Sequence, residues 1–471
     1  MPFQAHRPLR SRLALLLLPA LLAACGGGSD SDGSGGSGSA PPADCSVQGQ
    51  KAWLGNYMNE WYFWYRISPQ PDPAPYADVQ SYFDALLYTG SSADFPRDNY
   101  SGSQTMESFN RFFGDGATLG YGVAVAGLEL AGDGSRPLFV RHVEPLSPAA
   151  AQGVGVQRGD RVMLINGRAA SDYIAADDFS ALTAQQAGDT LSLTLRRNGV
   201  DRTVTLRAEV FSLTPVTGTT VITTAGGRRM GYVAVKDMIS QALAPLETAF
   251  ARFRAEAVQD VVLDLRYNGG GLVSTGATLA SYVAGTRGNG LNYASLLYND
   301  KRARENNKTE PFLRNQSSAL SLPRVFVLMG RRTCSASEQV INGLRGAGVE
   351  VVAVGETTCG KPVGFLPTSA CGRTYSVVNF ESVNHLNQGR YFDGFAPTCA
   401  VAENFSATQG GNADPLMSAA KQAADTGVCP AASVTASADA DRAFPLAARR
   451  SGVAPSRTLN EGDPSPGMIP R

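Results

Sequence analysis

The sequence predicts an α/β core preceded by a β-rich unit and a small helical region. From about residue 229 onwards, short apolar strands alternate with helical segments, which is typical of α/β architecture. Residues 117–211 contain strands of alternating polarity separated by glycines, and residues 46–116 repeat aromatic residues at helical spacing. A chain of 471 residues, 43% of them hydrophobic, is long enough for two or three domains.

The charge and histidine content argue against several classes of function. The chain has 41 basic and 41 acidic residues; residues 1–24 carry three arginines and no acid, so their removal leaves 38 basic residues against 41 acidic ones. A mildly acidic chain argues against nucleic acid as the main partner. Its three histidines, His6, His142 and His385, argue against a multi-histidine metal site and offer few candidates for a histidine base. We therefore expect no metal and no cofactor.

Residues 1–24 are predicted to be a lipoprotein signal peptide. Three arginines precede the apolar run Leu13–Ala24, which as a helix reaches about 18 Å and is too short for a hydrocarbon core about 30 Å thick. The run ends in Leu-Ala-Ala-Cys and resembles a bacterial lipobox with Cys25 as the lipidated residue; the alternative is ordinary signal cleavage beside a chance cysteine. Residues 25–45 would be a Gly/Ser-rich tether. We expect a protein of the bacterial cell envelope that is lipid-anchored to a membrane and faces the periplasm, with the outer membrane favoured by Gly26.

The other six cysteines are expected to form disulfide bonds in that oxidising compartment. Six cysteines allow 15 pairings, which the sequence does not resolve, and free buried thiols are the alternative. The six residues are Cys45, Cys334, Cys359, Cys371, Cys399 and Cys429.

Individual elements follow from apolar runs and their periods. Residues 430–471 lack such periodicity and are expected to form a loosely ordered tail. In the β-rich unit we expect strands at 137–143, 161–165 and 191–196; in the core 212–429 we expect strands at 230–235, 261–265, 325–329 and 349–354, and helices at 240–257 and from Ser335.

Three segments of the core carry candidate residues for chemistry. Residues 263–271 (LDLRYNGGG) lead a buried strand into three glycines, whose N–H groups can bind an oxyanion; the alternative is a tight strand-to-helix turn. Residues 333–338 (TCSASE) place Ser335 at a helix start, either as a nucleophile or as the N-cap of a Ser-x-x-Glu capping box. Residues 355–362 (GETTCGKP) contain Lys361. A loop lysine is usually a solvated charge, but burial would lower its pKa and let the neutral amine take a proton from a serine.

The combination of DLRYNGGG, TCSASE and GETTCGK is similar to the C-terminal processing peptidases, a family of Ser–Lys serine endopeptidases also called tail-specific proteases. The resemblance covers roughly residues 50–428 and implies an α/β protease core of crotonase/ClpP-like ββα repeats. It implies Ser335 as the nucleophile, with Ser337 as the runner-up, and Lys361 as the general base. The oxyanion donors it implies are backbone N–H groups of Gly269, Gly270 and Ala336.

Residues 117–211 resemble a PDZ domain inserted before this core. The resemblance rests on YGV at 121–123, EPLSPAA from Glu144 and RGDRVMLING at 158–167. Such domains add an extended chain to a sheet edge and hold its C-terminal carboxylate in a nest of backbone N–H groups. We therefore expect polypeptides with exposed C-termini as partners; a rigid spacer or regulatory lid is the alternative. The nest would be formed by Gly120, Tyr121, Gly122 and Val123.

Two departures from the family pattern bear on the site. Phe365 stands where many members carry a glutamine that orients the lysine, so we expect Glu356 or a backbone carbonyl to orient Lys361 instead. The spacing from Ser335 to Lys361 is one residue longer than usual, through an insertion near Gly346–Val349. Such a helix-to-strand turn tolerates extra length.

Cys334 and Cys359 flank the implied dyad and would be able to form a bridge if the serine and the lysine meet. The preferred interpretation is an envelope serine endopeptidase that binds exposed C-terminal tails. The alternatives are a PDZ-containing binding or scaffold lipoprotein with a degenerate core, and a Ser–Lys amidohydrolase acting on a non-protein amide.

Overall fold

The computed structural model describes residues 42, 44–126, 137–176, 178–430 and 468–470, all within one compact unit. The predicted signal peptide, Cys25 and nearly all of the predicted tether lie outside the described residues. Among the described residues, no helix is both long and apolar enough to span a membrane.

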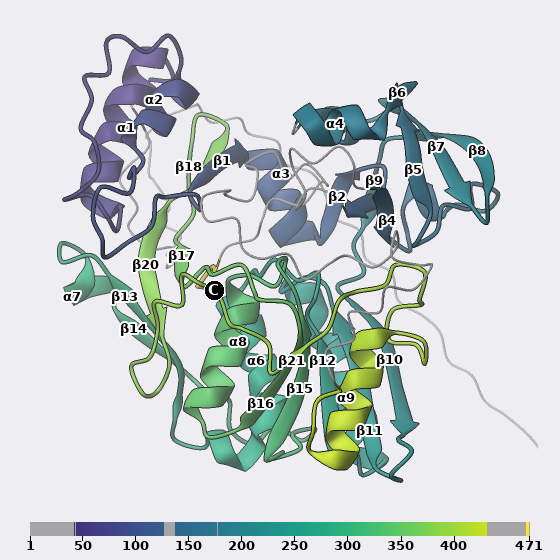
Figure 1. Ribbon diagram of the computed structural model, residues 1–471. Coiled ribbons are helices and arrows are strands. Elements are labelled where there is room, and N and C mark those ends of the chain that lie inside the picture. Colours follow the sequence, from purple (N-terminus) through teal and green to yellow (C-terminus); the bar gives the residue numbers. More distant parts are fainter. Residues whose placement is uncertain (1–41, 43, 127–136, 177, 431–467, 471) are drawn as a thin grey trace, which may run out of the picture. The chain divides into compact units, whose positions relative to one another are not determined.

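A six-stranded sheet forms the centre of the α/β core (Figure 1). Its strand order is β10-β11-β12-β15-β16-β21; β10 runs antiparallel to β11, and the other neighbours are parallel. The strands are β10 (Val216–Thr223), β11 (Arg229–Val235), β12 (Asp260–Asp264), β15 (Arg324–Met329), β16 (Glu350–Gly355) and β21 (Cys399–Ala400).

The four central strands β11, β12, β15 and β16 are buried on both faces, which explains why they are mainly apolar rather than alternating. Along β12, Val261 and Leu263 pack in the same cluster as three helices, whereas Val262 packs with a fourth helix on the opposite face. The three helices are α5 (Leu243–Ala255), α6 (Val273–Ala284) and α8 (Ala336–Gly346), and the fourth is α9 (Pro415–Thr426). The expected helix at 240–257 begins with a 3₁₀ turn, Ser240–Ala242, before α5.

The parallel register brings the three sequence motifs to one edge of the sheet. Asp264 at the end of β12 lies opposite Leu328 of β15, and Met329 at the end of β15 lies opposite Gly355 of β16. The three motifs lie at or shortly after the carboxyl ends of β12, β15 and β16, and in open α/β sheets the carboxyl ends of the strands are where ligands bind.

Two smaller antiparallel sheets flank the core. One contains β14 (Lys308–Pro311), β13 (Asn292–Tyr298), β20 (Val378–Val383) and β17 (Val363–Phe365); β17 follows Lys361 almost directly. The other contains β1 (Gly102–Thr105), β19 (Arg373–Ser376) and β18 (Thr368–Ala370). A short helix, α7 (Ala303–Asn306), lies between β13 and β14.

The N-terminal region packs its aromatic residues into the main core rather than into a core of its own. Trp53, Tyr57 and Trp61 of α1 (Val47–Trp61) are buried in the same cluster as the central strands. The region also contains α2 (Val79–Leu86), α3 (Met106–Asn110) and strand β1, so it is not helical throughout.

The β-rich unit has its own hydrophobic core and its own sheet, β3-β4-β5-β7-β8, with β6 paired to β5. The first and last strands of the unit in sequence, β2 and β9, pair with each other as an antiparallel two-stranded sheet. The elements are β2 (Ala117–Gly120), β3 (Val123–Ala126), β4 (Leu138–Val143), β5 (Arg161–Ile165), β6 (Arg168–Ala169), α4 (Ala170–Ala176), β7 (Thr190–Arg197), β8 (Val200–Arg207) and β9 (Glu209–Ser212).

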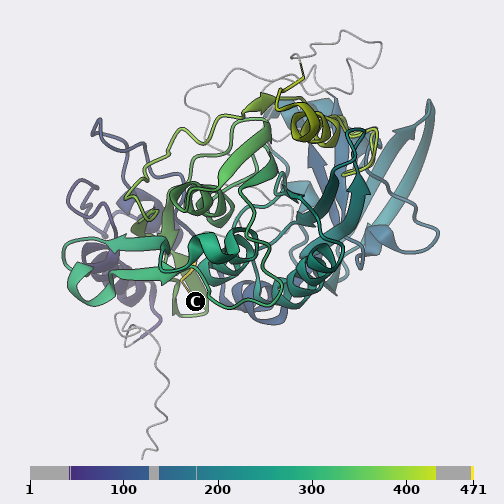
Figure 2. The same ribbon diagram turned by 90° about the horizontal axis from the view of Figure 1, so that it is seen from below.

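The end of the expected tail differs from the sequence-based expectation. Within residues 430–471 the structure describes Pro430 and Met468–Pro470, and Met468 and Ile469 are 0% and 2% exposed. These residues lie at the N-terminal end of α8, where the N–H of Met468 meets Ser335 (Figure 1; Figure 2 shows the same fold from below).

Candidate active site

Ser335 lies in the turn between β15 and α8, fully buried and with an uncommon backbone conformation. Its φ is 59° and its ψ is −116°, in a region that non-glycine residues rarely adopt. Such strain persists only where the surroundings hold it, and it is concentrated at functional sites. The hydroxyl Oγ accepts the N–H of Met468 at 2.7 Å.

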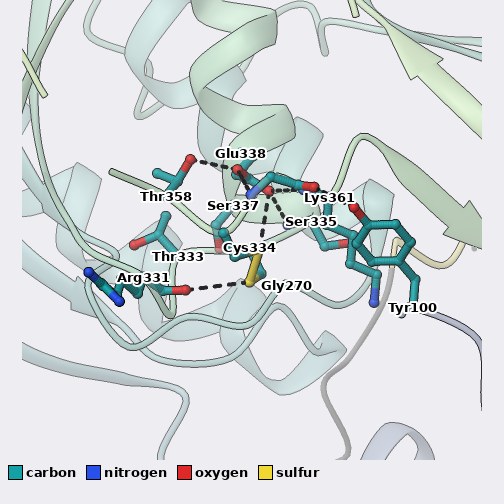
Figure 3. The surroundings of a disulfide bond; sticks show 12 residues. Tyr100, Gly270, Arg331, Thr333, Cys334, Ser335, Ser337, Glu338, Thr358 and Lys361 are labelled. Carbon is teal, nitrogen blue, oxygen red and sulfur yellow. Dashed lines mark hydrogen bonds between the residues drawn. A yellow bond between two sulfur atoms is a disulfide. The ribbon is translucent and has the colours of Figure 1, made fainter. Parts of the chain in front are cut away.

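A buried carboxylate, Glu338, joins the serine turn to the lysine loop (Figure 3). Its Oε2 accepts the N–H groups of Ser335 at 3.0 Å and Lys361 at 2.8 Å. Its Oε1 accepts the hydroxyl of Thr358 at 2.6 Å and the N–H of Gly360 at 2.8 Å. Glu338 forms the capping box expected from the sequence, but it also accepts three donors from another loop, which the motif alone does not indicate.

Asn268 holds the glycine loop against the serine turn from the opposite side. Its carbonyl oxygen accepts the N–H of Cys334 and the hydroxyl of Ser337, both at 3.0 Å. Ser337 therefore donates its hydroxyl to the glycine loop, whereas the Ser335 hydroxyl contacts the docked C-terminal segment. Asn268 itself is anchored through Nδ2 to the carbonyl of Val235 at 2.9 Å.

The three residues implied as oxyanion donors differ in their hydrogen bonds. The N–H of Gly270 donates to Asn268 Oδ1 at 2.9 Å, so this group is already engaged. Among the described residues, none accepts a hydrogen bond from the N–H of Gly269 or of Ala336, the first residue of α8. These two amides are therefore the members of the expected set that can bind an oxyanion.

Cys334 and Cys359 form the disulfide suggested by their positions around the dyad, with Cα atoms 5.3 Å apart. The bond ties the residue before Ser335 to a residue of the lysine loop. All six cysteines outside the predicted lipobox are paired, which is the expected outcome and excludes the free-thiol alternative. The other bonds are Cys45–Cys371 and Cys399–Cys429.

Lys361 is buried beside aromatic rings, and its charge is held in an unfavourable environment. Its Nζ lies 4.4 Å from the centroid of the Phe365 ring and 6.0 Å from that of Tyr100. Burial lowers the pKa of Lys361 from its ordinary 10.5 to about 8, and the negative charges of Asp98 and Glu338 oppose this change only in part. An appreciable fraction of neutral amine is therefore present near neutral pH.

Among the described residues, neither of the groups expected to orient Lys361, Glu356 or a backbone carbonyl, accepts a hydrogen bond from the lysine amine. Glu356 pairs with Arg331 at 3.8 Å, and the Phe365 ring packs against Nζ instead. Within the described residues Lys361 Nζ makes no hydrogen bond, either to a backbone carbonyl or to Ser335 Oγ. Catalytic hydrogen bonds often form only when substrate binds, so a catalytic pair of Ser335 and Lys361 is compatible with the absence of a bond between them here.

Asp98 and Tyr100 are parts of the site that no motif indicated. The N-terminal region carries both, and the Tyr100 hydroxyl donates to the carbonyl of Gly360 at 2.9 Å, immediately before the lysine. Asp98 accepts the hydroxyl of Tyr62 at 2.7 Å and the N–H of Tyr100 at 2.8 Å. The first region of the chain therefore shapes the wall of the lysine pocket.

The expected PDZ nest lines a groove that also reaches the catalytic loops. Gly122 has a φ of 79°, and a side chain there would collide with Ser147, so the turn requires glycine. Tyr267 of the glycine loop and Arg332 of the serine loop line the same groove. Its other lining residues include Leu119, Gly120, Tyr121, Gly122, Val123, Arg141, His142, Glu144, Leu182, Phe211 and Lys236.

Arg158 connects the PDZ unit to the core at this place. It donates to Glu403 at 2.8 Å and contacts the hydroxyl of Tyr267. Tyr267 is the residue before Asn268, so the PDZ unit contacts the loop that carries the candidate oxyanion donors. Among the described residues, no group of three His, Cys, Asp or Glu side chains is arranged to hold a metal ion.

The chain has an α/β core preceded by a β-rich unit with its own hydrophobic core, and comparisons with known families agree with this division. The model of peptidase family S41 matches residues 229–384, that of the peptidase S41 N-terminal domain matches 49–102, and that of the PDZ domain matches 117–196. The chain therefore belongs to peptidase family S41 and carries a PDZ domain.

Curated relatives and a solved structure are consistent with this assignment. The chain is 28% identical over 250 residues to the chloroplastic C-terminal processing peptidase of Tetradesmus obliquus and 26% identical over 251 residues to the carboxyl-terminal-processing protease of a Picosynechococcus species. These matches cover 51% of this chain in both cases, and 51% and 56% of the relatives, so the chain spans about half the length of each. A Bacteroides fragilis structure described as an S41 protease shares the fold, with a TM-score of 0.56 and 23% identity over 74% of this chain and 89% of that one.

Replacing Glu338 with alanine would leave four buried donors without their acceptor. Because each unsatisfied buried donor costs about 1–3 kcal/mol, we expect Glu338→Ala to lower the free energy of unfolding by at least about 3 kcal/mol. Urea unfolding under non-reducing conditions measures this. The matched control is Glu350→Ala at an exposed position of β16, for which we expect a change within about 0.5 kcal/mol. Equal losses in the two variants would contradict the role of Glu338.

Replacing Lys361 with methionine should stabilise the protein while removing its candidate base. Below about pH 8 the folded chain holds a buried ammonium, whereas the unfolded chain holds a solvated one with the ordinary pKa of 10.5. The difference corresponds to roughly 3 kcal/mol at neutral pH, and it decreases as the pH rises from about 8 towards 10.5. We expect Lys361→Met to raise the melting temperature at pH 7 and less so at pH 10. Lys308→Met, on an exposed strand, is the control, and a fall in melting temperature for Lys361→Met at pH 7 would contradict the lowered pKa.

Proposed function

We propose that the chain is a serine endopeptidase in which Ser335 is the nucleophile and Lys361 is the general base. The observation that carries this proposal is the Glu338 carboxylate, which binds the backbone of both residues at once. It is supported by the disulfide between the two loops and by the burial that lowers the pKa of Lys361. Membership of peptidase family S41 agrees with it.

In the proposed reaction the neutral amine of Lys361 takes the proton from the Ser335 hydroxyl as Oγ attacks the scissile carbonyl. The N–H groups of Gly269 and Ala336 bind the oxyanion of the tetrahedral intermediate. The ammonium then donates its proton to the leaving amine, and the acyl group remains on Oγ. Water, deprotonated by the same lysine, hydrolyses this ester and regenerates the serine.

The PDZ unit would supply the substrate. Its groove is lined both by the expected carboxylate nest and by Tyr267 and Arg332 of the catalytic loops. A chain whose C-terminus adds to the edge of β3 would therefore be held beside the glycine loop, at a high local concentration. We propose that the partners are polypeptides with exposed C-termini, and that the segments up to residue 45 tether the enzyme through Cys25 to an envelope membrane.

The direct test compares three forms of the chain lacking residues 1–44: the unchanged sequence, Ser335→Ala and Lys361→Ala. Each is incubated with an unfolded protein that has an apolar C-terminus, and the fragments are identified by mass spectrometry. We expect cleavage by the unchanged form only. Cleavage by Ser335→Ala would assign the nucleophile elsewhere, with Ser337 as the first candidate. Tail binding without cleavage by any form would favour a PDZ-containing scaffold.

A carboxylate nest predicts a specific dependence on the end of the ligand. Hydrogen bonds from backbone N–H groups to a charged acceptor contribute about 1.5–3 kcal/mol, so a peptide with a free C-terminal carboxylate should bind the PDZ groove about 10- to 100-fold more tightly than the same peptide amidated. Fluorescence anisotropy on the Ser335→Ala form measures both affinities without hydrolysis. Equal affinities would show that the groove does not read the C-terminus.

A further inference from the structure

The last described residues of the chain lie in its own candidate active site, where the backbone N–H and C=O groups of Met468 and Ile469 are all hydrogen-bonded. The N–H of Met468 donates to Ser335 Oγ at 2.7 Å, and its carbonyl accepts the N–H of Phe365 at 2.8 Å. Ile469 donates its N–H to the carbonyl of Gly271 at 3.0 Å and accepts the N–H of Val273 at 2.8 Å. Three of these bonds join backbone groups, as in a strand added between two others, and the fourth goes to the side-chain hydroxyl of Ser335.

The two residues pair with opposite walls of the site. Met468 forms a parallel bridge with Gly364 of β17, and Ile469 forms one with Leu272, just before α6. A side chain at Gly364 would come within 2.7 Å of the Met468 carbonyl, so glycine permits this close approach. The segment thus passes through the space between the lysine side of the site and the glycine-loop side.

Both side chains are buried in apolar surroundings. Met468 belongs to the main core cluster. Ile469 belongs to a separate apolar cluster contributed by the N-terminal region, the end of the PDZ unit and the core. This cluster contains Phe109, Phe112, Phe113, Phe211, Leu213, Ile239 and Leu272.

The contact with Ser335 has the geometry of a bound ligand rather than of nucleophilic attack. An oxygen that accepts an amide N–H lies close to the direction of that N–H bond and near the amide plane, whereas attack on a carbonyl comes from above this plane. While Met468 is in place, its N–H engages Oγ. Phe365 contacts both the bound segment and the candidate base, because its N–H donates to the Met468 carbonyl and its ring packs on the Lys361 amine.

We propose that the C-terminal segment Met468–Pro470 is a built-in ligand of the active site that competes with other polypeptides for it. This inference rests on the proposed function for the identity of the competitors. The bound residues Met468 and Ile469 also indicate which polypeptides compete: extended chains with two consecutive apolar residues after the peptide bond presented to Ser335. The 41 residues 427–467 that connect α9 to this segment are long enough to reach the site within one molecule and give the segment an effective concentration of about millimolar.

The test compares the full chain lacking only residues 1–44 with three variants. One ends after Gly467, and one keeps its full length but carries Met468→Glu with Ile469→Asp. The matched control carries Leu446→Asp with Leu459→Asp, two equivalent charge changes in the same tail. With a fluorogenic peptide substrate, we expect the first two variants to lower KM roughly tenfold at unchanged kcat. The control should behave as the parent chain.

A binding measurement separates this inference from the proposed function. The probe is the amidated peptide Ser-Pro-Gly-Met-Ile-Pro-Arg, which carries fluorescein at its N-terminus and lacks the carboxylate that the PDZ nest would hold. In the Lys361→Met background, which keeps the probe intact, we expect it to bind the chain ending after Gly467 at least tenfold more tightly than the full chain. A probe with Glu and Asp in place of Met and Ile should bind neither.

The outcomes are distinguishable. Tighter probe binding to the shortened chain, with no hydrolysis by any form, would support the built-in ligand and overturn the proposed peptidase. Hydrolysis with the same KM in all four chains, together with equal probe binding to the shortened and full chains, would overturn the built-in ligand and leave the peptidase in place.

Discussion

The arrangement of the site depends on one buried carboxylate, Glu338, and on the four donors that surround it. An unpaired buried charge is costly, so the Glu338 side chain fixes the Ser335 turn and the lysine loop in the one geometry that satisfies it. Burial raises the pKa of Glu338, and the hydrogen bonds from Thr358 and the backbone oppose that rise. The disulfide Cys334–Cys359 adds a covalent link between the same two loops.

The charge of Glu338 also raises the pKa of Lys361, whereas catalysis by a neutral amine needs that pKa to be low. This charge, with that of Asp98, favours the ammonium form of Lys361, yet the pKa of the lysine remains lowered to about 8 because desolvation is the larger effect. The Phe365 ring and the neighbouring Tyr100 supply part of the apolar surroundings responsible. The Phe365 ring therefore packs on the amine at the position where the family pattern leads us to expect a glutamine. Among the described residues no polar group hydrogen-bonds the amine, and its pKa is lowered by burial.

Much of the fold could be predicted because the central strands are short, apolar and separated by helices with clear periodicity. β5 coincides with the expected strand 161–165, and β11, β12, β15 and β16 lie within one residue of expectation at each end. The meeting of the three motifs is implied by the resemblance to the C-terminal processing peptidases. The pairing Cys334–Cys359 is the bridge that such a meeting would allow.

The contributions of Asp98, Tyr100 and Met468 could not be predicted, because each depends on long-range packing rather than on a local pattern. Asp98 and Tyr100 lie in a loop with no motif, more than two hundred residues before Lys361 in the chain. The tail is predicted to be loosely ordered because it lacks periodicity, yet its end contains two apolar residues, Met468 and Ile469, that pack into apolar clusters at the site. The hydrogen bond from the Gly270 N–H to Asn268 could not be predicted either, because the sequence does not distinguish the N–H groups of three successive glycines.

The central claim is that a buried lysine with a lowered pKa activates Ser335. The most direct measurement is the rate at which a sulfonyl fluoride modifies Ser335 across pH 5.5–10.5, with the labelled residue identified by mass spectrometry. The account predicts a rate that rises with pH, has a midpoint near 8 and is lost in Lys361→Ala. A rate independent of pH, or one that is unchanged in Lys361→Ala, would contradict it.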